Sequence, residues 1–213
     1  MAESVPRPLG LSEWVANSGV GSARRLTAWA SLNRTRSLAK GWCFVPSQAS
    51  QLLTPQQVLT LLAETPIRIA ALTASLAPAE LKSSPNVDEW TAHQVLAHLR
   101  ACADVWGDAI ATIVAEDEPT LRAVSPRTWI KQTDYLQQEF QSLLEVFAAQ
   151  RSHLVALLEP LPPEGWSRTA TVLGAGRALQ WTVLHYAQRL VDHERAHIRQ
   201  IEHIVTTVHG KTV

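Results

Sequence analysis

The residues of this chain best suited to chemistry are histidines, and their positions separate three of them from the rest. Among 213 residues there are eight histidines. His193 and His197 are four residues apart in a stretch with helical periodicity, so their side chains share one helix face. His98 lies in the middle of the apolar face of a different helical stretch. The others point away from such faces, flank one, or lie in the C-terminal tail: His93, His153, His185, His203 and His209.

Three imidazoles on inward helix faces need partners for their nitrogens. Burying an unpaired polar group costs about 1–3 kcal/mol. One divalent ion bound by His98, His193 and His197 would satisfy all three rings, but separate hydrogen bonds or a hydrogen-bonded cluster would also do so. The spacing leaves these alternatives open. Cys102, one turn after His98, could add a fourth ligand, although a buried free cysteine is more often a small core residue.

The segment from His193 to His197 also fits the H-E-x-x-H pattern of zinc peptidases. The longer form of that pattern needs a glycine turn where this chain has Gln200. A continuing helix carries His203 about 120° away from His197, so it cannot close the site. The only methionine is Met1, which excludes the later methionine turn of these enzymes. The sequence therefore disfavours a peptidase.

Four stretches with helical periodicity must position these residues. The first begins at Thr54 and the second at Thr91, and each start fits a capping box, with Gln57 and Gln94 as the reciprocal residues. The third begins at Ser125 and keeps an apolar seam to Leu157, which predicts one helix of about 30 residues. The fourth runs from somewhere after the Gly174-Ala175-Gly176 segment to about Thr206. No strand-like alternation competes with them, so we expect an all-α four-helix bundle.

Composition narrows the classes of function and location. Apolar residues make up 46% of the chain, enough for a packed core, and the formal net charge is zero, which argues against a nucleic-acid partner. No apolar run approaches the roughly 18 residues that cross a bilayer, and the N-terminus lacks the pattern of a signal peptide. Two cysteines are too few for a disulfide framework. We expect a cytoplasmic protein with no membrane partner.

The first 50 residues differ from the rest. They carry six Lys or Arg against two Asp or Glu, whereas residues 51–213 carry thirteen against seventeen. They show no sustained period, and Gly, Ser, Arg and Ala dominate. We expect residues 1–50 to be an irregular, disordered N-terminal extension outside the domain, which then covers residues 51–208. The alternative is a short basic amphipathic helix with a membrane-surface or targeting role.

Several motifs along the helical stretches match a known family in order and spacing: Glu89-Trp90-Thr91, Val95 to Leu99, Phe147, Arg151, Leu154 to Leu158, and Asp192 to Ile201. With them, the chain from about Val58 to Ile204 resembles the DinB-like superfamily, also called the DNA-damage-inducible or YfiT-like bundle family. A histidine before leucine on the second stretch, with a closing His-x-x-x-His, is that family's metal triad. The resemblance places it on His98, His193 and His197.

The resemblance implies a four-helix bundle, commonly a homodimer, that binds nickel, zinc, iron or manganese. Some members are transferases or isomerases that use a low-molecular-weight thiol such as bacillithiol or mycothiol. We therefore expect a metal-dependent S-transferase or hydrolase acting on a small molecule; the alternative is a non-catalytic, stress-related metal-binding or interaction module. The family name implies no DNA binding. Gln150 or Tyr186 could hydrogen-bond to the histidines and orient them. The alternatives are that Gln150 fixes the register of its helix and that Tyr186 packs in the core.

Overall fold

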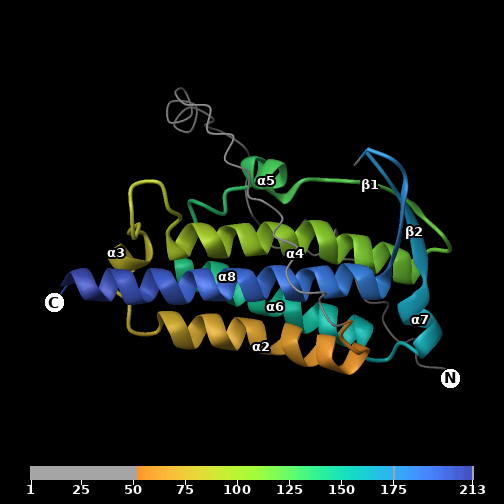
Figure 1. The fold of residues 1–213 in the computed structure, drawn as a ribbon, viewed down its shortest axis with the longest axis horizontal. Helices are drawn as coiled ribbons and strands as arrows, with labels where there is room; N and C mark the ends of the chain where they lie inside the picture. The colour runs from red at the N-terminus through yellow and green to blue at the C-terminus, as the bar shows by residue number, and fades with distance from the viewer. Residues whose placement is uncertain (1–51, 175, 213) are drawn as a thin grey trace, which may run out of the picture. The chain divides into compact units, whose positions relative to one another are not determined.

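A bundle of four long helices forms the body of the protein. The computed structural model describes residues 52–174 and 176–212, so the predicted extension, residues 1–50, lies outside the described residues. The long helices are α2 (Pro55–Thr73), α4 (Ala92–Ala115), α6 (Phe140–Leu158) and α8 (Val183–Thr212) (Figure 1). Helix α8 packs against α2 and α4, and α6 packs against the same two helices. The predicted four-helix bundle is confirmed.

The first two long helices begin where the sequence predicts. The side chain of Thr54 accepts from the backbone N–H of Gln57 at 3.3 Å, and Gln57 Oε1 accepts from the backbone of Thr54 at 2.9 Å. Thr91 and Gln94 form the same reciprocal pair, at 3.1 and 2.9 Å. Both capping boxes satisfy N–H groups that a helix start leaves without partners. The second fixes the start of the helix that carries His98.

The prediction of one unbroken helix from Ser125 to Leu157 was wrong. The chain makes a short helix, α5 (Pro126–Trp129), and a 3-10 turn, η1 (Ile130–Gln132), and α6 begins only at Phe140. Buried polar groups of α4 hold the segment between them: Arg100 donates to the side chain of Gln138 at 2.6 Å, and Tyr135 donates to Asp104 at 2.6 Å. These tertiary contacts outweigh the local preference for helix, because leaving the α4 groups unpaired would cost more.

The absence of strands was also a wrong prediction. The strands β1 (Thr120–Arg122), β2 (Thr169–Leu173) and β3 (Leu179–Thr182) form a sheet in that order, with β1 parallel to β2 and β2 antiparallel to β3. Gly174 and Gly176 have φ of 91° and 95°, which suits glycine, and they lie in the turn between β2 and β3. Strands of three to five residues are too short to show a period. Two further short helices complete the fold, α3 (Pro78–Leu81) and α7 (Pro163–Ser167).

A buried ion pair crosses the interior of the bundle. Arg151 on α6 donates through Nε to Oε1 of Glu194 on α8 at 2.7 Å, and both residues are 1% exposed. Because α6 and α8 each pack against α2 and α4, the pair joins helices on opposite sides of the core. Glu194 follows His193 directly, so the ion pair fixes the rotation of α8 where the histidines lie. Removing one partner of such a pair costs about 3–5 kcal/mol.

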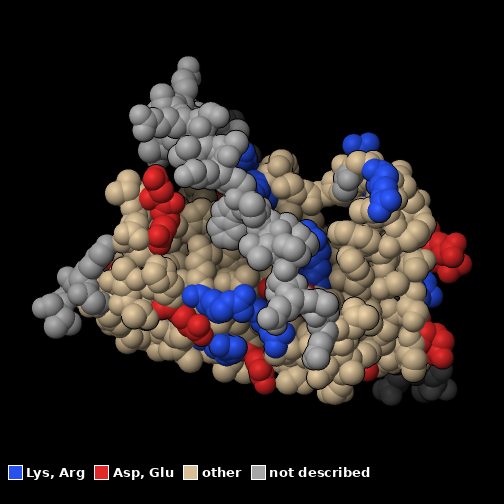
Figure 2. Space-filling model, viewed as in Figure 1, with Lys and Arg blue, Asp and Glu red and all other residues tan. Residues whose placement is uncertain are grey.

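The surface carries charges of both signs. On the face drawn in Figure 2, Lys and Arg side chains lie among Asp and Glu side chains. Two exposed ion pairs join residues far apart in the chain: Arg68 with Glu202 at 3.1 Å, and Lys82 with Glu139 at 3.3 Å. Exposed pairs of this kind contribute about 0–1 kcal/mol each. In the described part of the chain, no helix is both long and apolar enough to span a bilayer.

Candidate metal centre

The three histidines selected from the sequence lie together between two neighbouring helices. His98 projects from α4, and His193 and His197 project from α8. The ring centroid of His98 lies 5.1 Å from each of the other two, and those two are 4.5 Å apart. The Nε2 atoms of His98 and His193 are 3.3 Å apart. His98 is 6% exposed, and the other two rings are partly buried.

A sulfur atom lies beside the imidazoles. Cys102 is a free cysteine, 1% exposed, and its Sγ is 3.6 Å from Nε2 of His98. Among the described residues, the His98, Cys102 and His193 donor atoms all lie within 4.8 Å of one another. His197 is not part of that group, although its ring lies next to both histidines. Three potential ligand atoms therefore meet in one place, and the ring of His197 lies beside them.

Burial keeps the three imidazoles neutral. Desolvation, followed by the charges of His197 and Arg127, lowers the pKa of His98 to about 4. Desolvation, with the neighbouring histidines and two arginines, lowers the pKa of His193 to about 2. The pKa of His197 is also lowered, mainly by burial. A neutral imidazole has a free lone pair, which is the form that binds a metal ion.

One hydrogen bond fixes the proton on His197. Gln200 Oε1 lies 2.8 Å from Nδ1 of His197, and a carbonyl oxygen can only accept, so Nδ1 donates and Nε2 keeps its lone pair. The Nδ1 atoms of His98 and His193 are buried and have no partner in the described part of the chain. Gln200 therefore makes the kind of hydrogen bond to a histidine that we expected of Gln150 or Tyr186.

Those two expected orienting residues make their contacts elsewhere. Gln150 donates to Oδ1 of Asp104 at 2.5 Å. The ring of Tyr186 packs against Trp181, with centroids 4.8 Å apart. Sequence reasoning did not identify Gln200 because it stands outside the apolar stripe, and its spacing of three residues from His197 is the one signal that could have found it.

Two tryptophans flank the imidazole cluster. Trp90, in the loop before α4, meets His98 edge-on at 5.3 Å and lies parallel to His197 at 6.2 Å, with ring planes 1° apart. Trp106, two turns after His98 on α4, meets His193 edge-on at 5.0 Å. Both rings restrict the rotation of the imidazoles and exclude water from their sides.

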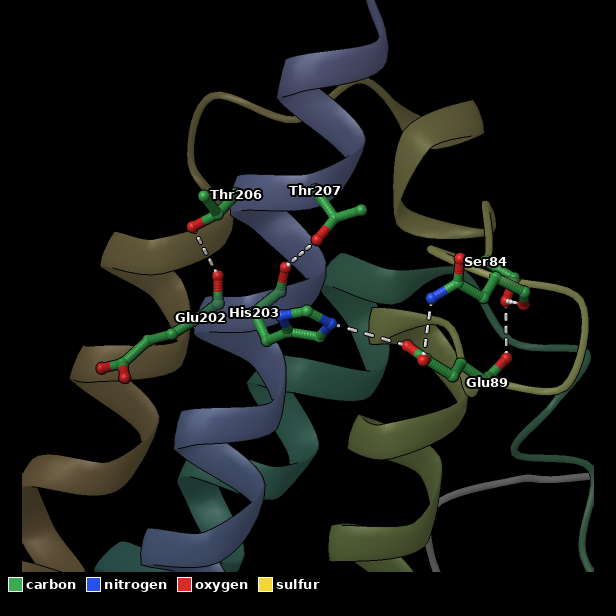
Figure 3. A network of polar contacts seen from close by, with 7 residues as sticks. Ser84, Glu89, Glu202, His203, Thr206 and Thr207 are labelled. Atoms are coloured by element: carbon green, nitrogen blue, oxygen red, sulfur yellow. Dashed lines mark hydrogen bonds and ion pairs between the residues drawn. The ribbon is translucent and has the colours of Figure 1, made fainter.

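A hydrogen-bonded network holds the loop that carries Trp90. Ser84 donates to the carbonyl of Glu89 at 2.6 Å, and Asn86 donates to its side chain at 2.8 Å (Figure 3). The same carboxylate lies 3.7 Å from Nε2 of His203 on α8. His203 therefore faces this loop and not the imidazole cluster, as its position on the helix predicts. The structure therefore gives no support to His203 as the third ligand of the longer zinc-peptidase pattern.

A second buried polar cluster lies further along α4. The carboxylate of Asp104 accepts through Oδ2 from the indole of Trp129 at 2.9 Å and from the hydroxyl of Tyr135 at 2.6 Å. Its Oδ1 accepts from Gln150 at 2.5 Å. These four residues, here called the Asp104 cluster, hold α5 and the segment after it against α4.

A cleft of about 470 Å³ lies next to the imidazoles. Its walls come from α4, α5, α8 and the three strands, and include Trp106, Trp129, Trp181, Tyr186, Arg122 and Arg189. Trp106 also contacts His193, so one ring separates the cleft from the imidazole cluster. The guanidinium of Arg189 lies 4.7 Å over the ring of Trp106 and 5.4 Å from that of Trp181. The three histidines themselves do not line the cleft.

Comparison with known proteins places the chain in a family. The sequence pattern of the DinB superfamily matches residues 61–201, which contain all three histidines. The chain belongs to the DinB superfamily. No curated protein sequence matches it.

Two solved structures share the fold of this DinB protein. YfiT from Bacillus subtilis, described as a probable metal-dependent hydrolase with an unusual four-helix bundle topology, is 17% identical with a TM-score of 0.63, over 74% of this chain and 91% of that one. A mycothiol-dependent maleylpyruvate isomerase is 14% identical with a TM-score of 0.54. That match covers 70% of this chain and 61% of the isomerase. At these identities the likeness establishes the fold alone.

Proposed function

We propose that this DinB protein is a metal-dependent enzyme whose divalent ion is held by His98, His193 and His197. The observation that carries the proposal is the convergence of three neutral imidazoles from α4 and α8. In a tetrahedral site with metal–nitrogen bonds of about 2.05 Å, ligand nitrogens lie about 3.3 Å apart. The His98 and His193 Nε2 atoms have that separation, 3.3 Å. The donor set therefore fits an ion.

The three histidines do not determine which metal ion binds. Imidazole sets bind zinc, nickel, iron and copper, and the DinB resemblance adds manganese. When bound, an ion in such a site lowers the pKa of a water or thiol that it ligates. Gln200, by accepting from Nδ1 of His197, would leave the lone pair of Nε2 free for an ion. Trp90 and Trp106 hold the rings from two sides and keep bulk water away.

We propose a small molecule as the substrate, and the reaction as transfer of a low-molecular-weight thiol or hydrolysis. The adjoining cleft, about 470 Å³, has room for a ligand of metabolite size. Its aromatic walls suit an apolar group, and its charged lining is mixed, with Arg122 and Arg189 beside Asp104 and Asp108. The mycothiol-dependent isomerase that shares the fold supports a reaction that uses a low-molecular-weight thiol. YfiT, described as a probable metal-dependent hydrolase, supports hydrolysis. We further propose that the protein is a homodimer in the cytoplasm and that it has no nucleic-acid or membrane partner.

The test is turnover by metal-loaded protein. Protein loaded with zinc, nickel, iron or manganese is assayed with a panel of thiols plus electrophiles, and with a panel of esters and amides. We expect turnover in one panel and its loss in His197→Ala. His153→Ala is the matched control, because that histidine is exposed on α6 and lies outside the cluster. Metal-loaded protein that turns over nothing in either panel would leave only a binding module.

A further inference from the structure

The atom Nε2 of His98 has two close neighbours. Nε2 of His193 lies 3.3 Å away and Sγ of Cys102 lies 3.6 Å away. An unprotonated Nε2 has one lone pair, and a protonated one has a single hydrogen, so neither form makes a full hydrogen bond to both neighbours. All three donor atoms lie within 4.8 Å of one another. A single cation at their meeting point would satisfy the three atoms together.

The separations match those of ligands on one ion. With zinc–nitrogen bonds of about 2.05 Å and a zinc–sulfur bond of about 2.3 Å, tetrahedral geometry puts two nitrogens about 3.3 Å apart and a nitrogen and a sulfur about 3.6 Å apart. The two distances to Nε2 of His98 are 3.3 and 3.6 Å. An S–H···N hydrogen bond would explain the longer distance and an N–H···N hydrogen bond the shorter one, but Nε2 of His98 can take part fully in only one of them.

The environment of the sulfur also suits a ligand. His98 is 6% exposed and Cys102 is 1% exposed, so neither can turn to solvent for a partner. Both residues lie on α4 one turn apart, and that spacing directs their side chains to the same side of the helix. The thiol is therefore held in place by the helix and needs no movement to reach the ion.

We infer that Cys102 is the fourth protein ligand, which gives a site of three nitrogens and one sulfur. This inference rests on the proposed function, because it needs the ion that the histidines hold. On binding, the sulfur–metal bond forms and the S–H bond breaks, and the proton passes to the buffer. The shell is then complete without solvent. A substrate thiol must displace Cys102 or enter as a fifth ligand, so Cys102 governs access to the ion.

Cobalt reports the sulfur directly. Protein in which Co²⁺ replaces the native ion is measured by absorption in the near ultraviolet and the visible region. We expect a sulfur-to-cobalt charge-transfer band in the wild type, its loss in Cys102→Ser and Cys102→Ala, and its retention in Cys43→Ser, the matched control. The two Cys102 variants should still bind cobalt, more weakly than the wild type, because the histidines remain. Circular dichroism verifies that each variant keeps its helices.

The outcomes separate this inference from the proposed function. Cobalt that binds the wild type without a charge-transfer band overturns the inference and leaves the three-histidine site intact. A band that survives in Cys102→Ala but disappears in Cys43→Ser also overturns it. If the wild-type protein binds none of cobalt, zinc and nickel, the chain has no metal site, and both proposals fail together.

Discussion

Two buried polar clusters lie side by side on α4, and they differ in how well their atoms are paired. In the Asp104 cluster, both carboxylate oxygens of Asp104 accept hydrogen bonds, from an indole, a hydroxyl and an amide, and Oε1 of Gln150 is the one buried side-chain atom of these four residues without a partner among the described residues. In the imidazole cluster, the Nδ1 atoms of His98 and His193 have no partner among the described residues, and their Nε2 atoms face each other. Both clusters are mostly buried, so the difference does not come from solvent.

The comparison separates a structural network from a functional site. A polar network whose central group is fully paired fixes one arrangement of the helices around it, and the carboxylate of Asp104 holds α5 and Trp129 over α4 in this way. An incompletely paired one costs free energy in the folded protein and persists where another partner repays that cost. For the imidazole cluster, the partner that we propose is a metal ion, because the donor atoms of His98, Cys102 and His193 lie within 4.8 Å of one another.

The largest expected effect comes from removing the centre of the Asp104 cluster. Asp104→Ala takes the acceptor from three donors, and each buried donor left without a partner costs about 1–3 kcal/mol, so we expect a loss of about 3 kcal/mol or more in the free energy of unfolding. Chemical denaturation of the metal-free protein measures it. His98→Leu should change the same quantity by less than about 1 kcal/mol, because it removes a poorly paired group.

The opposite ranking would break the comparison. If His98→Leu destabilised the metal-free protein as strongly as Asp104→Ala, the imidazoles would be a satisfied structural network. Asp108→Ala, one turn beyond Asp104 and exposed, is the control for loss of a carboxylate on α4 and should change stability by about 0.5 kcal/mol or less.

A smaller effect should follow from the residue behind His197. Gln200→Ala frees Nδ1 of His197, and loss of such a supporting bond weakens metal affinity by about 10- to 100-fold. Competition with a chromophoric chelator measures it. Gln188→Ala is the matched control on α8, because that amide accepts from the backbone of Leu53 instead. Equal affinity in Gln200→Ala and the wild type would show that the ring needs no such support.

The sequence predicted what depends on local pattern. Capping boxes at Thr54 and Thr91 depend on residues three apart, and both formed. Helical periodicity put His98, His193 and His197 on inward faces, and α4 and α8 are neighbours, so the rings meet. The angle between His197 and His203 was enough to separate them. These features follow from helix geometry alone.

Features that depend on tertiary partners could not be predicted. The segment from Thr133 to Glu139 has a helical apolar pattern, but contacts with Arg100 and Asp104 hold it out of a helix. The sheet depends on the pairing of β1 with β2, two segments far apart in the chain, and β3 then pairs with β2 across a short turn. Which atoms approach Nε2 of His98 depends on the offset between α4 and α8, and no pattern within either helix records that offset.

The most direct test of the metal centre is the metal content of the purified protein by element analysis. We predict one divalent ion per chain in the wild type and in His93→Ala, whose histidine is buried on the same helix but contacts the backbone of Gln138. His98→Ala should contain less than about a tenth of that amount, since it removes the imidazole that α4 contributes to the site. Equal metal content in His98→Ala and His93→Ala, or none in the wild type even after incubation with zinc or nickel, would contradict the account.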